Sequence, residues 1–489
     1  MKVLYLHPAP VYAEKILTNP YLEVDKKIMA EIYTSSEPMD NLEILCDVHG
    51  SRFPGLTGDK GAVDYIIEKF KEYGLENVHA EDFTIPGWKR GPATLEVVSP
   101  VEKTFDVISL PHSIGDEVEA ELVFIGPGAI KDYDEDKIKG KILMVTSESP
   151  PDMERFLHRS EKYMRSVMAG AVGWIFMNHY PAYGPPTGGI NPVIPAVGIS
   201  HEDGSYLARL LAREGKVVCR LKTTDENVDI KTWNVIGDVV PDTSVDDEYL
   251  VVGSHLDGHD ISQGAVDPAS GAVTVMEIAR NLNKVKDQLK RRVRCMTFGA
   301  EEIGLYGSYE YADKHQDELD KCRFMLNLDA AGGEGKKGLN IHDFPSIEKL
   351  VKKWEEEMVA EIPTKQGVSP YSDHWPFFLK SVPCASNSDP TKTRSGRGYG
   401  HTRYDTLDKV DIKYLHLAAA NHSRILLRVA NEENWSPRRK TQEEIEAFIE
   451  EQGYDRTVAL ADEMRDYIKE NYKTIHPDTK LWIERGGAW

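Results

Sequence analysis

Cysteine is scarce in this chain, and the few cysteines are widely scattered. There are five of them, an odd number, and no two occur in a Cys-x-x-Cys spacing. A disulfide framework and a metal site built from thiolates are therefore both unexpected. This pattern is typical of proteins in a reducing interior, so we expect a cytoplasmic location.

Long apolar runs and an excess of positive charge are also missing. No stretch approaches the ~18 consecutive apolar residues of a membrane span, and the first residues contain no signal-peptide core or small-residue cleavage site. The formal net charge is −21, which is the wrong sign for binding a phosphate backbone. We therefore expect neither a membrane nor a nucleic-acid partner.

What the chain does contain is enough apolar residues, 40% of 489, to form more than one core. Short apolar strands separated by Gly- and Pro-containing loops occupy residues 96–228, and longer strands alternating with helices follow. We predict an α/β fold with a mixed central sheet flanked by helices, formed by residues 1–95 and 229–433, with a β-rich insert at 96–228. Residues 434–489 are highly charged and have helical periodicity, which indicates a surface extension or an oligomer contact.

Three apolar strands in the segment after residue 229 each end at a potential metal ligand. EYLVVGSH ends at His255, and CRFMLNLDAAGG contains Asp329 where its apolar run stops. RRVRCMTFGAEE ends at Glu301 and Glu302. Ligands of open α/β sheets bind beyond the carboxyl ends of the strands. Clustered carboxylates repel one another and are costly to bury without a cation, so we predict a metal site at this edge.

The types of ligand indicate which metal. Imidazole combined with carboxylate, without thiolate, suits zinc, manganese or cobalt better than calcium or magnesium. One zinc ion needs only three protein ligands, and the candidates exceed that number once Asp267 and the segment YGHTRYDT are added. The surplus indicates two ions about 3.5–4 Å apart that share a carboxylate and a nucleophilic water, with one glutamate left as general base. The residues alone do not say which glutamate that is.

The motifs occur in a characteristic order along the chain: SHLDGHD, GAVDPASG, GAEEIGLYGS, NLDAAG, YSDHWPF and GHTRYDTLDKVD. The series resembles the co-catalytic zinc exopeptidases, a family that includes bacterial aminopeptidases and glutamate carboxypeptidases. GLENVHAEDFTIPGWKRGPATLEVVSP and GHDISQGAVD resemble its plasma glutamate carboxypeptidase, or carboxypeptidase Q-like, branch. The resemblance covers roughly residues 45–430. It implies a zinc exopeptidase fold of the phosphorylase/hydrolase type, a protease-associated insert and a homodimer.

The same resemblance assigns two Zn²⁺ ions per chain, for which Co²⁺ or Mn²⁺ could substitute, and it assigns their ligands. It implies that Asp267 bridges the two ions, that His255 and Asp329 complete one site, and that Glu302 and His401 complete the other. We also predict a cis bond between Asp267 and Pro268, because the family's bridging aspartate tends to precede a cis bond and proline lowers its cost.

The resemblance makes Glu301 the general base and makes Asp257 the carboxylate that orients the ring of His255. Other polar residues of these motifs are expected to stay outside the chemistry: His259, Asp260 and His342 as loop or surface residues, and Asp405 with Thr406 as braces of the loop that carries His401.

Candidate substrate-binding residues lie late in the chain. Asp373 and His374 match a family motif near the substrate, and Tyr399 is a candidate oxyanion donor because Gly400 stands where relatives have an aromatic residue or histidine. Arg394 and Arg397 belong to a basic segment that could bind a substrate carboxylate.

We therefore expect hydrolysis of terminal peptide bonds in short peptides or dipeptides, of the carboxypeptidase or dipeptidase type rather than the aminopeptidase type. One alternative is a cyclotransferase with a single zinc ion, like the glutaminyl cyclases. The other is a binding protein without catalysis, like the transferrin receptor ectodomain.

Overall fold

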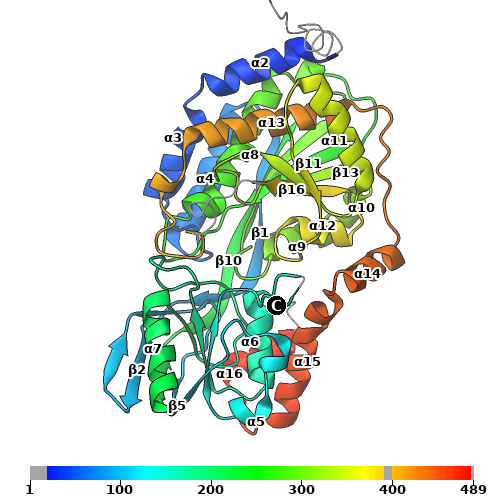
Figure 1. Ribbon diagram of the computed structural model, residues 1–489. Helices are drawn as coiled ribbons and strands as arrows, with labels where there is room; N and C mark the ends of the chain where they lie inside the picture. Colours follow the sequence, from blue (N-terminus) through cyan, green and yellow to red (C-terminus); the bar gives the residue numbers. More distant parts are fainter. Residues whose placement is uncertain (1–18, 154, 390–398, 486–489) are drawn as a thin grey trace, which may run out of the picture.

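The computed structural model describes residues 19–153, 155–389 and 399–485. Within these residues the strands form two eight-stranded sheets, which occupy the upper and lower halves of the molecule in Figure 1. None of the described helices is long and apolar enough to cross a membrane.

The first sheet is mixed, as predicted, and its central strands are parallel. β11 (Tyr249–His255) lies between β12 (Arg292–Phe298) and β13 (Cys322–Asn327), and all three run in the same direction. Each is a nearly continuous buried apolar run, which is typical of a parallel sheet covered on both faces. The sheet order is β1-β10-β12-β11-β13-β16-β14-β15, and the other strands are β1 (Glu76–Lys89), β10 (Glu226–Val239), β14 (Gly338–Ile341), β15 (Thr364–Gln366) and β16 (Cys384–Ser388).

Helices cover both faces of this sheet (Figure 1). In α4 (Thr57–Glu72), Val63, Ile66 and Phe70 recur at helical spacing and are buried. The chain turns away at Gly74, whose φ of 80° costs little without a β-carbon. The other helices of this half are α2 (Leu22–Tyr33), α3 (Glu37–Glu43), α8 (Ser270–Lys284), α9 (Tyr306–Lys314), α10 (Gln316–Leu319), α11 (Pro345–Met358), α12 (His374–Leu379) and α13 (Ile412–Asn431), with π-helical turns at Ile44–Val48 and Ala265–Ala269 and 3₁₀ turns at Lys286–Gln288 and Leu407–Lys409.

The inserted segment forms the second sheet, in which β5, β6, β7 and β8 are parallel neighbours. The chain enters this half from β1 and leaves it into β10, and these two long strands pair with each other in antiparallel fashion. The predicted insert, 96–228, begins within the strand Ala93–Ser99 of this sheet and ends within β10 of the first sheet. Its elements are β2 (Ala93–Ser99), β3 (Lys103–Phe105), β4 (Val107–Ser109), β5 (Glu117–Phe124), β6 (Ile142–Thr146), β7 (Gly173–Met177), β8 (Ala196–Ile199), β9 (Val218–Thr223), α5 (Glu135–Ile138), α6 (Arg159–Met168), α7 (His201–Glu214) and a 3₁₀ turn at Ile130–Asp132.

The C-terminal segment is helical, as its periodicity predicts, but it is more than a surface extension. α14 (Gln442–Glu451) leads away from the first half, and α15 (Asp455–Asn471) and α16 (Pro477–Arg485) lie against the insert (Figure 1). Leu460, Met464, Ile468 and Trp482 are buried in one apolar core with residues of the insert. The charged residues that dominate its composition cover the outer face, while an apolar stripe joins the insert core.

Candidate metal centre

The strand ends bring the predicted ligands to one edge of the first sheet. β11 ends at His255, and β12 ends at Phe298, shortly before Glu301. β13 ends at Asn327, shortly before Asp329. Because the three strands are parallel neighbours, their carboxyl ends meet at one edge, as the sequence predicts.

Three of the predicted ligands form a first group. Nε2 of His255 lies 3.3 Å from Oδ1 of Asp267 and 3.8 Å from Oδ1 of Asp329, and all three side chains are largely buried. The hydroxyl of Ser372 donates a hydrogen bond to Oδ2 of Asp329 at 2.8 Å. Sequence reasoning did not single out Ser372, although it stands inside the motif YSDHWPF.

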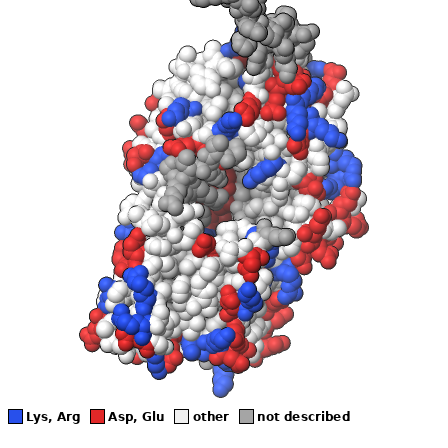
Figure 2. Space-filling view, in the orientation of Figure 1, with Lys and Arg blue, Asp and Glu red and all other residues white. Residues whose placement is uncertain are grey.

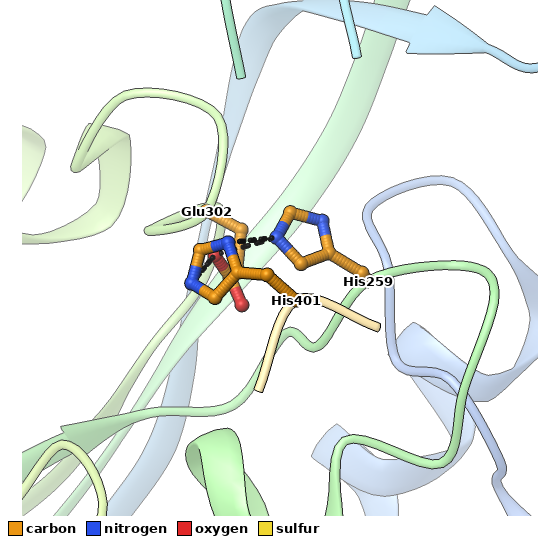
Figure 3. Close-up of side chains that lie close together, drawn as sticks. All are labelled: His259, Glu302 and His401. Carbon is orange, nitrogen blue, oxygen red and sulfur yellow. Dashed lines mark hydrogen bonds and ion pairs between the residues drawn. The ribbon is translucent and has the colours of Figure 1, made fainter. Parts of the chain in front are cut away.

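A second group consists of Glu302, His401 and His259 (Figure 3). Nε2 of His401 lies 3.6 Å from Oε2 of Glu302, and Nε2 of His259 lies 2.9 Å from the same oxygen. His259 is therefore not the surface residue that was expected, because its ring is buried and turned toward the two predicted ligands. Asp260 does lie outside both groups, where it pairs with Arg90.

Asp267 lies between the two groups. Its Oδ1 faces His255, and its Oδ2 is 3.5 Å from Nε2 of His401. The predicted cis bond between Asp267 and Pro268 is confirmed. The carboxylate of Asp405 accepts hydrogen bonds from the backbone N–H groups of Val266 (2.7 Å) and Asp267 (3.1 Å). Asp405 was expected to brace the loop of His401, and its hydrogen bonds join that loop to the backbone of the shared aspartate.

Asp257 also differs from its expected role. Nδ1 of His255 lies 3.0 Å from the backbone carbonyl of Asp257, whereas the nearest carboxylate oxygen is 3.8 Å away. That carboxylate accepts hydrogen bonds from the backbone N–H groups of Glu301 (2.9 Å) and Glu302 (3.1 Å). Asp257 thus orients His255 through its main chain and holds the glutamate pair with its side chain.

Several residues of the site have left-handed backbone conformations. The φ angles are 29° at Asp329, 61° at His401 and 60° at Ala300, which precedes the glutamate pair. Such angles are uncommon for residues with a β-carbon, and they gather at functional sites where packing imposes them. At Ala300 and Asp329 they turn the chain shortly after the ends of β12 and β13.

The electrostatics of the site favour a bound cation. Burial and the neighbouring carboxylates Glu302, Asp373 and Asp329 raise the pKa of Glu301 well above its ordinary value. Burial, with repulsion from Glu302, raises the pKa of Asp257 to about 6. Oε1 of Glu302 is buried and has no hydrogen-bond partner in the described part of the chain. Buried carboxylates next to imidazoles, with oxygen left unsatisfied, fit a divalent metal, and zinc accepts this set of donors.

A cavity of about 480 Å³ opens beside the site, between the two halves of the molecule. Glu301, Glu302 and His401 line it from the first half, and the insert contributes Arg159 among other residues. Figure 2 shows the hollow in the middle of this face, with acidic atoms inside it. The site therefore has room for a small ligand that contacts both halves.

The comparison with known families agrees with this geometry. Residues 234–426 match the model of peptidase family M28, and this match spans both ligand groups. Over these residues the chain is similar to peptidase family M28. This match and the metal-site geometry indicate a metal-dependent hydrolase, as expected from the sequence. Residues 118–207 match the PA domain, which confirms the predicted protease-associated insert.

Individual relatives are moderately similar to this chain. Carboxypeptidase Q of Xenopus laevis is 25% identical over 411 residues, which cover 82% of this chain and 87% of that protein. A peptidase M28 precursor from Shewanella amazonensis SB2B is 26% identical with a TM-score of 0.73, covering 86% of this chain and 98% of that chain. BSAP, a zinc aminopeptidase from Bacillus subtilis, is 25% identical with a TM-score of 0.64, covering 81% and 95%.

The structure places Asp373 and His374, two of the expected substrate residues, away from the cavity wall. Asp373 and His374 are buried, and neither lines the cavity. The ring of His374 stacks on that of His342, with centroids 3.7 Å apart, so His342 is a core residue and not the surface residue that was expected. Tyr399 packs against Tyr183 of the insert, with ring centroids 4.9 Å apart.

Part of the predicted basic segment lies outside the described residues. Arg394 and Arg397 lie outside the described residues, so their binding of a carboxylate stays a prediction. Arg403, at the end of that segment, pairs with Asp106 on the surface of the insert. The hydroxyl of Thr406 bonds Asp408 locally.

Proposed function

We propose that the protein is a di-zinc exopeptidase that cleaves dipeptides or the C-terminal bond of short peptides. The observation that carries this proposal is the position of Asp267, whose two oxygens face two separate groups of imidazole and carboxylate ligands. A single-zinc site would leave one group without a cation. Two zinc ions sharing Asp267 would neutralise both groups.

When bound, the two ions would polarise the scissile carbonyl and lower the pKa of the attacking water. Glu301 lines the cavity, belongs to neither ligand group and is half-buried, so its carboxylate is available as the general base. It takes a proton from the water and delivers it to the leaving amine. Asp257 fixes the backbone of Glu301 for this transfer.

The charges of the cavity support recognition of a substrate carboxylate. Among the described residues that line it, Glu301 and Glu302 are the only acids and Arg159 is the only lysine or arginine. An aminopeptidase needs a spare carboxylate for the substrate's α-amine, whereas a carboxypeptidase needs a cation for the α-carboxylate. Nε of Arg159 donates to the carbonyl of Gly189 at 3.0 Å, which anchors the guanidinium at the wall of the cavity.

Three forms of one dipeptide test this preference: the free form, the N-blocked form and the C-amidated form. We expect hydrolysis of the first two and a large loss with the third. Arg159→Gln should raise KM for the free dipeptide, and Arg159→Lys should recover part of that loss because it retains the charge. Efficient cleavage of only the amidated form would refute carboxylate recognition.

Elemental analysis separates this proposal from the single-zinc alternative, since two zinc ions per chain are expected. Reconstitution with cobalt or manganese tests the substitute metals.

We further propose a cytoplasmic homodimer. The five cysteines, all buried and free, support the reducing location. Light scattering combined with gel filtration measures the oligomeric state.

A further inference from the structure

His259 is the one residue of the second group that neither the family resemblance nor its motif suggested as a ligand. It lies in the loop that follows β11, and only 2% of its surface is exposed. Its ring lies 4.6 Å from that of His401 and is stacked near the ring of Phe53, with centroids 6.5 Å apart. The imidazole is thus enclosed, and its direction is set by packing.

Hydrogen bonds hold the loop of His259 at both ends. The fully buried guanidinium of Arg52 donates to the carbonyls of Leu256 (2.9 Å), Gln263 (2.8 Å) and Gly264 (2.8 Å). The buried guanidinium of Arg52 therefore joins the two ends of the loop that carries His259. A loop fixed in this way can present a side chain at a defined position without loss of entropy on binding.

The neighbouring residue Asp260 gives a second anchor. Both of its carboxylate oxygens accept hydrogen bonds from Arg90, at 2.7 Å each. This paired geometry is the strongest that arginine and carboxylate form. Asp260 points to Arg90 while His259 points to the metal centre, so the two residues have separate roles.

Hydrogen bonds do not satisfy both ring nitrogens of His259, because its Nδ1 is buried without a hydrogen-bond partner among the described residues. Its Nε2 lies 2.9 Å from Oε2 of Glu302 and 3.0 Å from Nδ1 of His401 (Figure 3). If that Nε2 carries a proton, it can donate to Oε2 of Glu302, but it opposes Nδ1 of His401, which needs its own proton to bond the carbonyl of Thr187 at 3.3 Å. If Nε2 carries a lone pair, it faces a carboxylate oxygen directly. Since Nδ1 of His401 bonds Thr187, His401 offers its Nε2 to an ion, and a cation bound by that atom, Oε2 of Glu302 and Nε2 of His259 removes the second conflict.

We propose that His259 is a direct ligand of the second metal ion, which then has His259, Glu302, His401 and one oxygen of Asp267. This inference rests on the proposed two-metal function. Among the described residues, the first ion would have His255, Asp329 and the other oxygen of Asp267. The two sites are therefore unequal: the second offers four protein ligands, two of them imidazoles, and the first offers three and an open position. The second ion should bind more tightly and leave later during chelation.

Metal titration of His259→Phe tests the proposal, because phenylalanine keeps the ring and removes the nitrogen. Stepwise binding of Co²⁺ to the metal-free full chain is followed by its visible absorption, with a competing chelator. We expect one equivalent to bind as in the wild type and the other at least about tenfold more weakly, or about 1.4 kcal/mol. His422→Phe is the matched control, since His422 is a fully buried histidine outside both groups.

His259→Gln distinguishes a ligand from a positioning residue. An amide can still hydrogen-bond His401, but it is a poor ligand for zinc or cobalt. Recovery of the second equivalent by glutamine would overturn direct coordination, as would unchanged binding of both equivalents in His259→Phe.

X-ray absorption of the zinc-loaded wild type gives a measurement that does not depend on the folding of a variant. It should show three imidazole ligands for two zinc ions, and two imidazoles would overturn the proposal. A wild type that binds one zinc ion or none would contradict the proposed function itself, which separates the two failures.

Discussion

Replacement of Glu301 by glutamine tests the chemistry of the site most directly. The change keeps the shape of the side chain and the backbone hydrogen bond to Asp257, and it removes only the ability to accept a proton. Since Glu301 belongs to neither ligand group, both metals should remain. General-base catalysis contributes about 10²–10⁴-fold, and each factor of ten corresponds to about 1.4 kcal/mol. We therefore expect kcat to fall by that range, a barrier about 3–5 kcal/mol higher, with little change in KM.

The assay pairs steady-state kinetics on a free dipeptide with elemental analysis of zinc. Glu302→Gln gives the contrast, because the same change one residue later removes a metal ligand and should lower the zinc content. Glu310→Gln, on the exposed face of α9, is the matched control and should behave as the wild type. Full zinc content with kcat within about threefold of the wild type would refute the role of Glu301.

The same variant has a second, independent readout in the metal-free protein. Burial and neighbouring carboxylates raise the pKa of Glu301, so its ionised form destabilises the folded state as the pH rises. Glutamine cannot ionise. The metal-free variant should therefore unfold at a higher temperature than the metal-free wild type at pH 8. A lower melting temperature of the variant would contradict the idea that ionised Glu301 is repelled by its neighbouring carboxylates.

Three further perturbations test the metal centre, a buried acid and the C-terminal helices. Removal of zinc by a chelator should lower the melting temperature, and added zinc should restore it, because an ion present at 100 times its Kd stabilises by about 2.7 kcal/mol; no change on removal would contradict a metal-stabilised site. Burial raises the pKa of Asp59 to about 7, so its contribution to stability is lost as the pH rises from about 4 through 7. Asp59→Asn should therefore be more stable than the wild type at pH 8, by up to about 4 kcal/mol, and similar to it at pH 4 in chemical denaturation; an equal difference at both pH values would argue against this titration. Met464→Ala should lower the free energy of unfolding by about 2–5 kcal/mol, because Met464 is fully buried in the core shared with the insert. The control Met29→Ala, at an exposed position, should lower it little, and thermal unfolding measures both variants.

The ligands at the strand ends could be predicted because the strands themselves can be recognised in the sequence. β11, β12 and β13 are apolar runs long enough for parallel strands, and a parallel arrangement forces their carboxyl ends to one edge. His255, Glu301 and Asp329 follow from that rule alone. The division of the ligands into two groups came from the family resemblance, and the two oxygens of Asp267 agree with it.

His259 could not be found in this way. Its contact with His401 joins residues that are 142 positions apart, and its own motif offers two aspartates and a second histidine as equal candidates. The hydrogen-bond partners of Asp405 could not be predicted for the same reason, since Val266 and Asp267 are distant from it in sequence. No local pattern reports which of several polar loop residues turns inward.

The C-terminal helices show a similar limit. Their periodicity predicted helices, but a hydrophobic stripe does not say which surface it will cover. Only the path of the chain after α14 brings Met464 and Trp482 to the insert.

The sequence by itself determined the kinds of donor, their order and the edge at which most of them gather, because side-chain chemistry and strand periodicity are local properties. The tertiary structure alone decided that His259 joins the second group and that Arg159 of the insert faces the same cavity as Glu301. It also decided that the carboxylates of Asp257 and Asp405 accept hydrogen bonds from backbone N–H groups. Those outcomes depend on distances between segments far apart in the chain, and such distances are set by how loops and domains pack.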